Sequence, residues 1–189
     1  RLELYAEYDA GEITAVNAGV KLMKLLQISA GAVYDDERLV CLCDADSKYD
    51  EIMRTFNELG RTKLIVVAAF VHIVERLCER MVKEGIRAKY IHGGVKDRAS
   101  IINDFQDGDL QILVLQPQTV SHGITLTAAN TIVWQSYIQS GETHLQMLGR
   151  INRPGQTRNQ YIQYLIGSKV EKLTVDRLIG KSDMSSSVL

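Results

Sequence analysis

Between residues 63 and 179, short apolar segments alternate with amphipathic helical segments, and this alternation constrains the fold more than any other feature. The segment 63–70, KLIVVAAF, is a continuous apolar run, which is typical of a strand buried on both faces. Residues 72–85 follow it with the apolar spacing of a helix. Further strands are expected at 87–91, 111–115, 131–134 and 161–166, and further helices at 96–106, 141–151 and 169–179. This alternation predicts an α/β fold, a doubly wound and mainly parallel sheet of five to six strands with helices on both faces.

The first 59 residues lack this rhythm and are expected to form an N-terminal appendage, largely helical. Residues 14–29 have helical spacing and end before Gly31, and residues 38–43 are a short strand candidate. Ser47 and Asp50 suggest a capping box for a helix over 48–59 that Gly60 ends, and Ser168 and Glu171 suggest another for the last helix. We therefore expect an appendage over 1–59, one domain over 60–181 and a tail over 182–189.

Composition excludes several classes of protein. Lys and Arg number 22 against 23 Asp and Glu, so no polybasic arm or acidic tail dominates the chain. Three cysteines, Cys41, Cys43 and Cys78, form no even disulfide framework and no zinc-type pair, which indicates a reducing compartment. No metal site is expected. Residues 110–141 carry no charge, but polar residues punctuate them, so no membrane span is expected.

Motifs for self-contained catalysis are missing from the sequence. No GxxxxGK(S/T) phosphate loop, GxGxxG dinucleotide loop, GxSxG elbow or HExxH zinc motif occurs. The chain starts with Arg1 and ends in SSSVL, and we expect it to be a piece of a longer protein.

The densest candidate motif is 146–158, QMLGRINRPGQTR. Arg150 and Arg153 are three residues apart and would share one face where Pro154 and Gly155 end a helix. Two guanidinium forks aimed in one direction suit a chain of phosphates. On charge alone, a solvated basic helix end fits equally well.

The spacing QxxGRxxRxGQ resembles motif six of helicase superfamily two, and the trailing Gly-Gln is similar to the Swi/Snf family of double-stranded DNA translocases. The matching residues are Gln146, Gly149, Arg150, Arg153, Gly155 and Gln156. Other segments resemble the family in the expected order: 63–70 is similar to motif four, 90–109 to the block around His92-Gly93-Gly94 and Arg98, and 112–134 to motif five. The resemblance covers about residues 15–180 and is greatest to compact members from phages and prophages.

This resemblance implies a RecA-like fold and the second of two motor lobes. The first lobe of such proteins carries the Walker A and Walker B residues and holds most of ATP and Mg²⁺. The parent protein would then hydrolyse ATP and move along DNA, whereas this chain alone would be inactive. Its expected partners are the N-terminal RecA-like lobe and double-stranded DNA, with no membrane, in the cytoplasm of a bacterial or phage-infected cell.

The resemblance also implies roles for single residues. Arg150 and Arg153 would be catalytic arginine fingers on the γ-phosphate of ATP, with Arg153 as the direct contact. Gly123 would let the backbone approach the nucleotide, unless it is an ordinary turn glycine. Gln146 would order the cleft or bond to the backbone of motif five, unless it lies on the helix surface.

Five further residues are expected at the DNA backbone. They are Gly93, Gly94, Arg98, Gln118 and Thr119. The alternatives are a simple strand-to-helix turn for the two glycines and a loop anchor or solvated helix residue for Arg98. Gln116, Pro117 and Thr125 depart from the family pattern, as do residues 139–141.

Two other functions fit parts of the sequence. A non-catalytic nucleic-acid-binding or interaction module could reuse the same fold. A flavodoxin-like or Rossmann-like small-molecule domain is disfavoured because no glycine fingerprint follows a strand.

Overall fold

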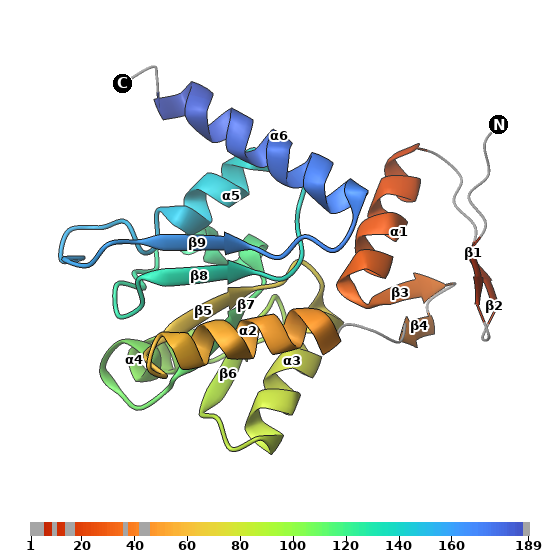
Figure 1. The fold of residues 1–189 in the computed structure, drawn as a ribbon. Coiled ribbons are helices and arrows are strands. Elements are labelled where there is room, and N and C mark those ends of the chain that lie inside the picture. Colours follow the sequence, from red (N-terminus) through yellow and green to blue (C-terminus); the bar gives the residue numbers. More distant parts are fainter. Residues whose placement is uncertain (1–5, 9–10, 14–17, 36–37, 42–45, 187–189) are drawn as a thin grey trace.

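The computed structural model describes residues 6–8, 11–13, 18–35, 38–41 and 46–186 (Figure 1). Its centre is a five-stranded parallel sheet in the order β6-β7-β5-β8-β9. The strands are β5 (Leu64–Val67), β6 (Ala88–Ile91), β7 (Ile112–Leu115), β8 (Thr131–Trp134) and β9 (Tyr161–Tyr164). Each lies inside a segment for which the sequence predicts a strand, so the expected parallel α/β sheet is confirmed.

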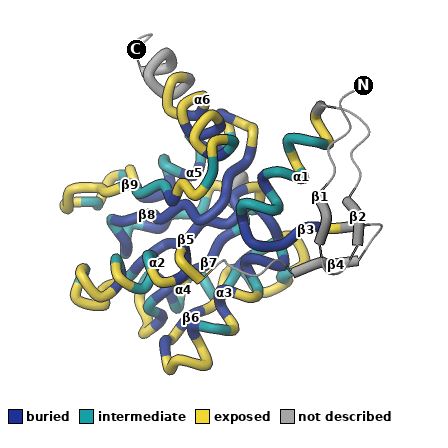
Figure 2. Tube along the Cα trace, turned by 45° about the vertical axis from the view of Figure 1, so that its right-hand side comes forward, coloured by how far each residue is buried: buried dark blue, intermediate teal, exposed yellow. Residues whose placement is uncertain are grey.

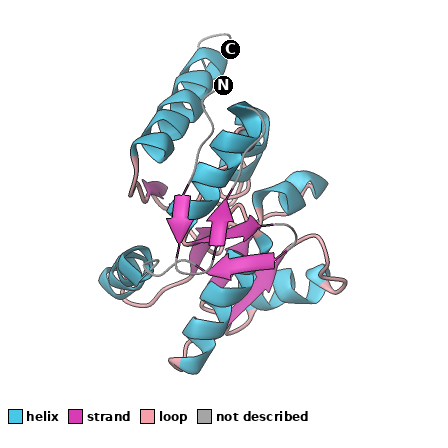
Figure 3. Cartoon of the chain, turned by 90° about the vertical axis from the view of Figure 1, so that its right-hand side faces the viewer, coloured by secondary structure: helices cyan, strands magenta, loops and turns pink. Residues whose placement is uncertain are grey.

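Helices cover both faces of this sheet (Figure 3). They are α2 (Asp46–Glu58), α3 (Val71–Lys83), α4 (Arg98–Asp107), α5 (Gly141–Leu148) and α6 (Lys169–Ser186), with a 3₁₀ segment η1 (Pro117–His122). From β5 the chain crosses to the edge strand β6, and from β6 it crosses back in the opposite direction to β7, which lies between them. Because such crossovers are right-handed, α3 and α4 lie on opposite faces.

The core follows from the burial of the central strands. Every residue of β5, β7 and β8 is buried, while the edge strands β6 and β9 are partly exposed (Figure 2). The continuous apolar run at 63–70 is therefore a strand buried on both faces, as its sequence predicts. Helix α2 buries Tyr49, Ile52 and Phe56 in this same core. The expected domain boundaries at residues 59 and 181 stay a prediction.

The N-terminal segment contains the strand predicted within 38–43 and, among the described residues, three further strands that its sequence pattern did not indicate. Helix α1 (Ala18–Ala30) is followed by β3 (Ala32–Asp35) and β4 (Arg38–Cys41), which pair antiparallel. A second two-stranded sheet pairs β1 (Ala6–Tyr8) with β2 (Gly11–Ile13). Strands of three or four residues show too little alternation to be recognised in a sequence. The predicted residues 14–17 of the first helix and 42–43 of the first strand lie outside the described residues.

One predicted capping box is wrong and the other is half formed. Helix α2 begins at Asp46, so Ser47 lies in its first turn, where an acidic first residue also suits the helix dipole. At α6, the backbone N–H of Glu171 donates to Ser168 Oγ at 3.3 Å, as predicted. The Glu171 carboxylate accepts from the N–H of Gly167 at 2.8 Å instead of from Ser168. The helix also continues past its expected end at residue 179.

A buried ion pair joins three elements of the domain. Lys48 on α2 and Glu171 on α6 form this pair, and both residues are at least nine-tenths buried. Lys48 Nζ also donates to the backbone oxygen of Gln135, just after β8, at 2.9 Å. The Gln135 side chain in turn donates to the backbone oxygen of Ala30 at the end of α1, at 3.0 Å. These contacts tie α1, α2 and α6 to the end of the central strand β8.

None of the described helices has both the length and the apolar character needed to cross a bilayer.

Candidate functional site

The residues singled out by sequence fall into two groups that η1 connects. Gly93, Gly94 and Arg98 follow the carboxyl end of β6, and Gln118 and Thr119 follow that of β7. Because these strands are parallel neighbours, the five residues lie at one edge of the sheet. The second group forms where the segment after η1 meets the end of α5, and it contains Gly123, Arg150 and Arg153.

The Arg153 side chain forms hydrogen bonds with the segment that follows η1. Its Nε donates to the backbone oxygen of Gly149 at 3.3 Å. One terminal nitrogen donates to the backbone oxygen of Gly123 and to Thr125 Oγ1, each at 3.3 Å. The side chain is half-buried, and these bonds fix its guanidinium between α5 and the loop. Thr125, which the sequence marked only as a departure from the family pattern, is thus one of its anchors.

Arg150 is a buried cation without a carboxylate partner. Its exposed fraction is 7%, and its Nε is buried with no hydrogen-bond partner among the described residues. No described carboxylate forms an ion pair with Arg150 or Arg153. Burial, and after it the positive charge of Arg153, lowers the pKa of the Arg150 guanidinium. Because an unpaired buried charge is costly, this site is electrostatically suited to an anion.

Gly123 ends η1 in the left-handed conformation, with φ 72° and ψ 15°. A Cβ built at this position meets no protein atom within 4 Å. Within the described chain, glycine is therefore favoured here by its backbone angle and not by crowding.

Gln146 makes a local contact on α5. Its Nε2 donates to Glu142 Oε1, one helical turn earlier, at 3.1 Å. The expected bond to the backbone of the segment around Gly123 is absent from the hydrogen bonds of Gln146 in the described chain, so that interpretation is corrected. An acidic neighbour at i−4 on the same helix is a closer partner than a loop.

The backbone N–H groups of Gly93 and Gly94 both donate hydrogen bonds to nearby side chains. Gly93 N–H donates to Gln116 Oε1 at 3.3 Å, and Gly94 N–H donates to His92 Nδ1 at 3.0 Å. The two glycines precede a helix, as predicted, but α4 begins at Arg98 and not at residue 96. The carboxylate of Asp97 caps that helix start by accepting from the N–H of Ser100 at 3.2 Å.

Arg98 anchors the same loop in this structure. Its Nε donates to the backbone oxygen of Val95 at 3.0 Å, and a terminal nitrogen donates to that of Gly93 at 2.9 Å. Across the edge, Thr119 Oγ1 donates to the backbone oxygen of Gln116 at 2.6 Å, while Gln118 is exposed. Of these residues, Gln118 therefore offers the most accessible side chain.

Gln116 is a site residue whose role the sequence did not reveal. Its Oε1 accepts from Gly93 N–H, and its Nε2 donates to the backbone oxygen of Ala69 at 3.4 Å. One carboxamide thus ties together the carboxyl ends of β5, β6 and β7. The only sequence signal was that Gln116 departs from the hydroxyl residue usual at this position.

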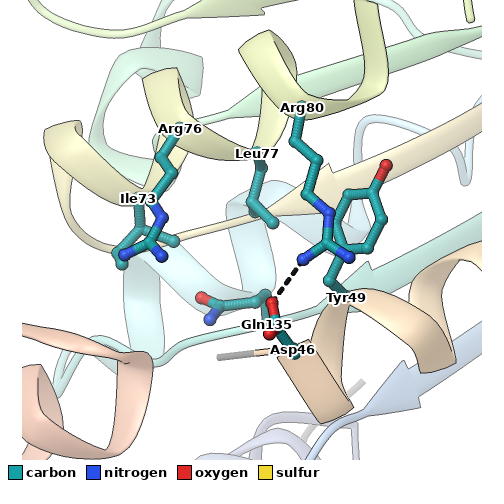
Figure 4. Close-up of a pocket in the computed structure, with 7 residues that line it drawn as sticks. All are labelled: Asp46, Tyr49, Ile73, Arg76, Leu77, Arg80 and Gln135. Carbon is teal, nitrogen blue, oxygen red and sulfur yellow. Dashed lines mark hydrogen bonds and ion pairs between the residues drawn. The ribbon is translucent and has the colours of Figure 1, made fainter. Parts of the chain in front are cut away.

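A separate pocket lies between α2 and α3 (Figure 4), with about 310 Å³ of empty space. The Arg80 guanidinium lies 3.7 Å from the centroid of the Tyr49 ring and pairs with Asp46. Arg76 extends into the same pocket above Gln135, whose Oε1 is buried without a partner among the described residues. No residue singled out by sequence lines this pocket, so it is not part of the candidate site.

The described residues contain no cluster of three or more His, Cys, Asp or Glu side chains arranged to hold a metal ion.

Comparison with known proteins places the sequence of this chain in one family. The family model described as "Helicase conserved C-terminal domain" matches residues 47–155. The protein p41 of Acyrthosiphon pisum secondary endosymbiont phage 1 is 27% identical over 183 residues, which cover 94% of this chain and 37% of p41. The SWI/SNF-related matrix-associated actin-dependent regulator of chromatin subfamily A-like protein 1 of Xenopus tropicalis is 29% identical over 112 residues, which cover 58% of this chain and 12% of that protein. This chain thus spans well under half the length of these curated relatives.

Solved structures show the same fold. The C-terminal part of the Fun30 ATPase domain superposes with a TM-score of 0.62 at 21% identity, over 70% of this chain and 44% of that chain. The C-terminal domain of the DEAD-box protein Dbp5 gives a TM-score of 0.62 at 17% identity, over 73% and 79%. The expected RecA-like fold is confirmed.

Proposed function

Because this chain belongs to the helicase conserved C-terminal domain family, as a second lobe of superfamily-two type, we propose that it is a motor lobe of an ATP-dependent DNA translocase. In this role it supplies arginine fingers to ATP and holds the DNA backbone. Its sequence contains no GxxxxGK(S/T), so the first lobe of the parent protein would bind most of ATP and Mg²⁺.

The observation that carries the proposal is the unpaired charge of Arg150. Arg150 is a buried residue, 7% exposed, and lies close enough to Arg153 for their charges to interact, yet it lacks a carboxylate partner among the described residues. A phosphoryl group from the facing lobe would supply the missing negative charge. When bound there, ATP supplies the bond that is hydrolysed, and preplaced guanidiniums stabilise the charge that develops on its phosphoryl oxygens.

Arg153 and Gly123 have supporting roles in this proposal. Arg153 is half-buried, and the second terminal nitrogen of its guanidinium has no hydrogen-bond partner among the described residues, so it can donate to the γ-phosphate. The same side chain binds the backbone oxygen of Gly123. A contact between Arg153 and phosphate would therefore be transmitted to η1. The residues Gln118 and Thr119 of η1 belong, with Gly93, Gly94 and Arg98, to the DNA-facing group. Gln146 stays at the rim of this site.

For DNA, we propose that Gln118 and Thr119 face the backbone of one strand, while Gly93, Gly94 and Arg98 shape the loop beside them. The exposure of Gln118 and the internal bonds of the other residues support this division. Contacts of this kind position a protein on DNA without reading its sequence. The phage relative makes the cytoplasm of a bacterial cell the expected place of action.

The nucleic acid is tested by ATP turnover of a protein that carries both lobes. Double-stranded DNA should raise the turnover at least severalfold, while double-stranded RNA should leave it near the unstimulated rate. The isolated chain should hydrolyse no ATP under any of these conditions. Equal stimulation by RNA, or DNA-stimulated hydrolysis by the isolated chain, would contradict the proposal.

A further inference from the structure

The amino ends of three strands of the five-stranded sheet carry cations that the proposed function does not use. Arg61 and Lys63 lie just before β5, Arg87 lies just before β6, and Arg158 lies shortly before β9. Together with Asp109 and neighbouring backbone, they line an open groove with about 700 Å³ of empty space. We name this the basic groove. Four cations face one carboxylate there, in a chain of net charge −1.

The basic groove is distinct from the DNA-facing group described above. Its cations precede the strands, whereas Gly93, Gly94, Gln118 and Thr119 follow them. Because the five strands are parallel, the two sets lie at opposite edges of the sheet.

Backbone carbonyls, and not carboxylates, hold three of these four cations. Lys63 Nζ donates to the oxygen of Gly108 at 2.7 Å, and Arg87 Nε donates to that of Asp109 at 2.7 Å. A terminal nitrogen of Arg158 donates to the oxygen of Ala128 at 2.7 Å. These bonds fix the side chains but leave their charges in place. None of the four cations forms an ion pair with a residue in the described part of the chain.

Some cations elsewhere in the domain form ion pairs, whereas the four of the basic groove form none among the described residues. The pairs include Arg54 with Glu51, Arg80 with Asp46, Lys89 with Asp104 and Lys172 with Asp176. What distinguishes the basic groove is that four cations and one carboxylate line the same open surface.

Arg61 adds a second observation. Its φ is 58°, in the left-handed region, where bulky residues are rare. Its N–H donates to the backbone oxygen of Phe56 at 2.9 Å, and its guanidinium lies 5.7 Å from the Phe56 ring centroid. No hydrogen bond from that guanidinium is found among the described residues. A glycine or asparagine would suit this backbone better than the arginine that the sequence has here.

We propose that the basic groove binds the phosphate backbone of DNA, as a second DNA contact of the same lobe. This inference rests on the proposed function, in which the lobe binds DNA and DNA is therefore the polyanion next to it. Three of the four cations are guanidiniums, whose planar forks match phosphate oxygens. Their spread along the amino edge suits a row of phosphates better than one small anion. The contact would be independent of base sequence and sensitive to salt.

Fluorescence anisotropy of a short labelled DNA duplex with this chain tests the groove. The double variant Arg61→Gly with Arg87→Gln should bind about tenfold more weakly at low salt, and the slope of log affinity against log salt should fall by about two. Glycine adopts the backbone angle found at Arg61 without steric cost, so the melting temperature of the single variant Arg61→Gly should not fall. The matched control is Lys172→Gln, which removes one exposed charge on α6.

Four results would overturn the inference. They are no duplex binding by the unmodified chain at low salt, unchanged binding by the double variant, an equal loss in Lys172→Gln, and equally tight binding of labelled polyglutamate. The last result would assign the groove to an acidic protein segment. Failure here is distinguishable from failure of the proposed function, because that function is measured by ATP turnover of the two-lobe protein.

Discussion

Replacing Arg153 with alanine in a protein that carries both lobes should lower ATP turnover by about 10³-fold or more. The loss corresponds to about 4 kcal/mol of transition-state stabilisation. ATP binding should stay within a few-fold of the unmodified protein, because the first lobe holds most of the nucleotide. Steady-state turnover and equilibrium binding of a fluorescent ATP analogue together measure this separation.

Arg150 allows a sharper form of the same test. Arg150→Met keeps most of the side-chain volume and removes a buried charge that lacks a partner among the described residues. Turnover should fall as far as for Arg153→Ala, while the free energy of unfolding of the isolated chain should stay equal or rise by about 1 kcal/mol. A merely structural arginine would show the opposite combination, with lower stability and no specific loss of turnover.

Two control variants distinguish the effect of the planar guanidinium group from the effect of positive charge alone. Arg153→Lys keeps the charge without the planar fork and should recover only part of the turnover. Arg54→Ala removes an exposed arginine on α2 and should leave turnover unchanged. Near-normal turnover of both Arg153→Ala and Arg150→Met would remove the pair from the reaction.

Replacing Glu171 with glutamine should lower the free energy of unfolding by about 3 kcal/mol. The change keeps the shape of the side chain and its acceptor for the N–H of Gly167. It removes the negative charge beside Lys48, which then remains as an uncompensated cation that is 8% exposed. Urea unfolding of the isolated chain, followed by circular dichroism, measures the effect.

The same helix provides a matched control for this change. Asp176→Asn breaks an exposed pair with Lys172 and should cost less than about 0.5 kcal/mol. Adding Lys48→Met to Glu171→Gln should recover much of the lost stability, because no buried charge is then left unpaired. Equal losses for Glu171→Gln and Asp176→Asn would show that the buried pair has no special role.

The central sheet was predictable because its strands are buried on both faces. Residues 64–67 and 112–115 are apolar throughout. An amphipathic helical segment of the same length would include polar residues on its exposed face. Of the short strands near the N-terminus, β4 lies inside the strand predicted at 38–43. The strands β1, β2 and β3 were not predicted, since pairing with a neighbouring strand decides their structure more than their own pattern does. The start of α2 was also misplaced, because Asp46 and Ser47 both suit a first turn or a cap.

The candidate site was predictable as a set of residues but not as a set of contacts. The spacing of Arg150 and Arg153 predicts one face at the end of a helix over 141–151, but α5 ends at Leu148 and both arginines lie in the turns that follow. The spacing also does not reveal that Arg150 is buried and unpaired among the described residues. The bond between Arg153 and Gly123 joins residues 30 positions apart, and the sequence gives no sign of it. Gln116 was missed for the same reason, because its function lies in contacts with two other strand ends.

A structure of the two-lobe protein with a non-hydrolysable ATP analogue and duplex DNA tests the central claim most directly. The account predicts a guanidinium nitrogen of Arg150 or Arg153 about 2.7–3.2 Å from an oxygen of the γ-phosphate. A closed complex in which both side chains keep their present contacts, with neither reaching the phosphate, would contradict it.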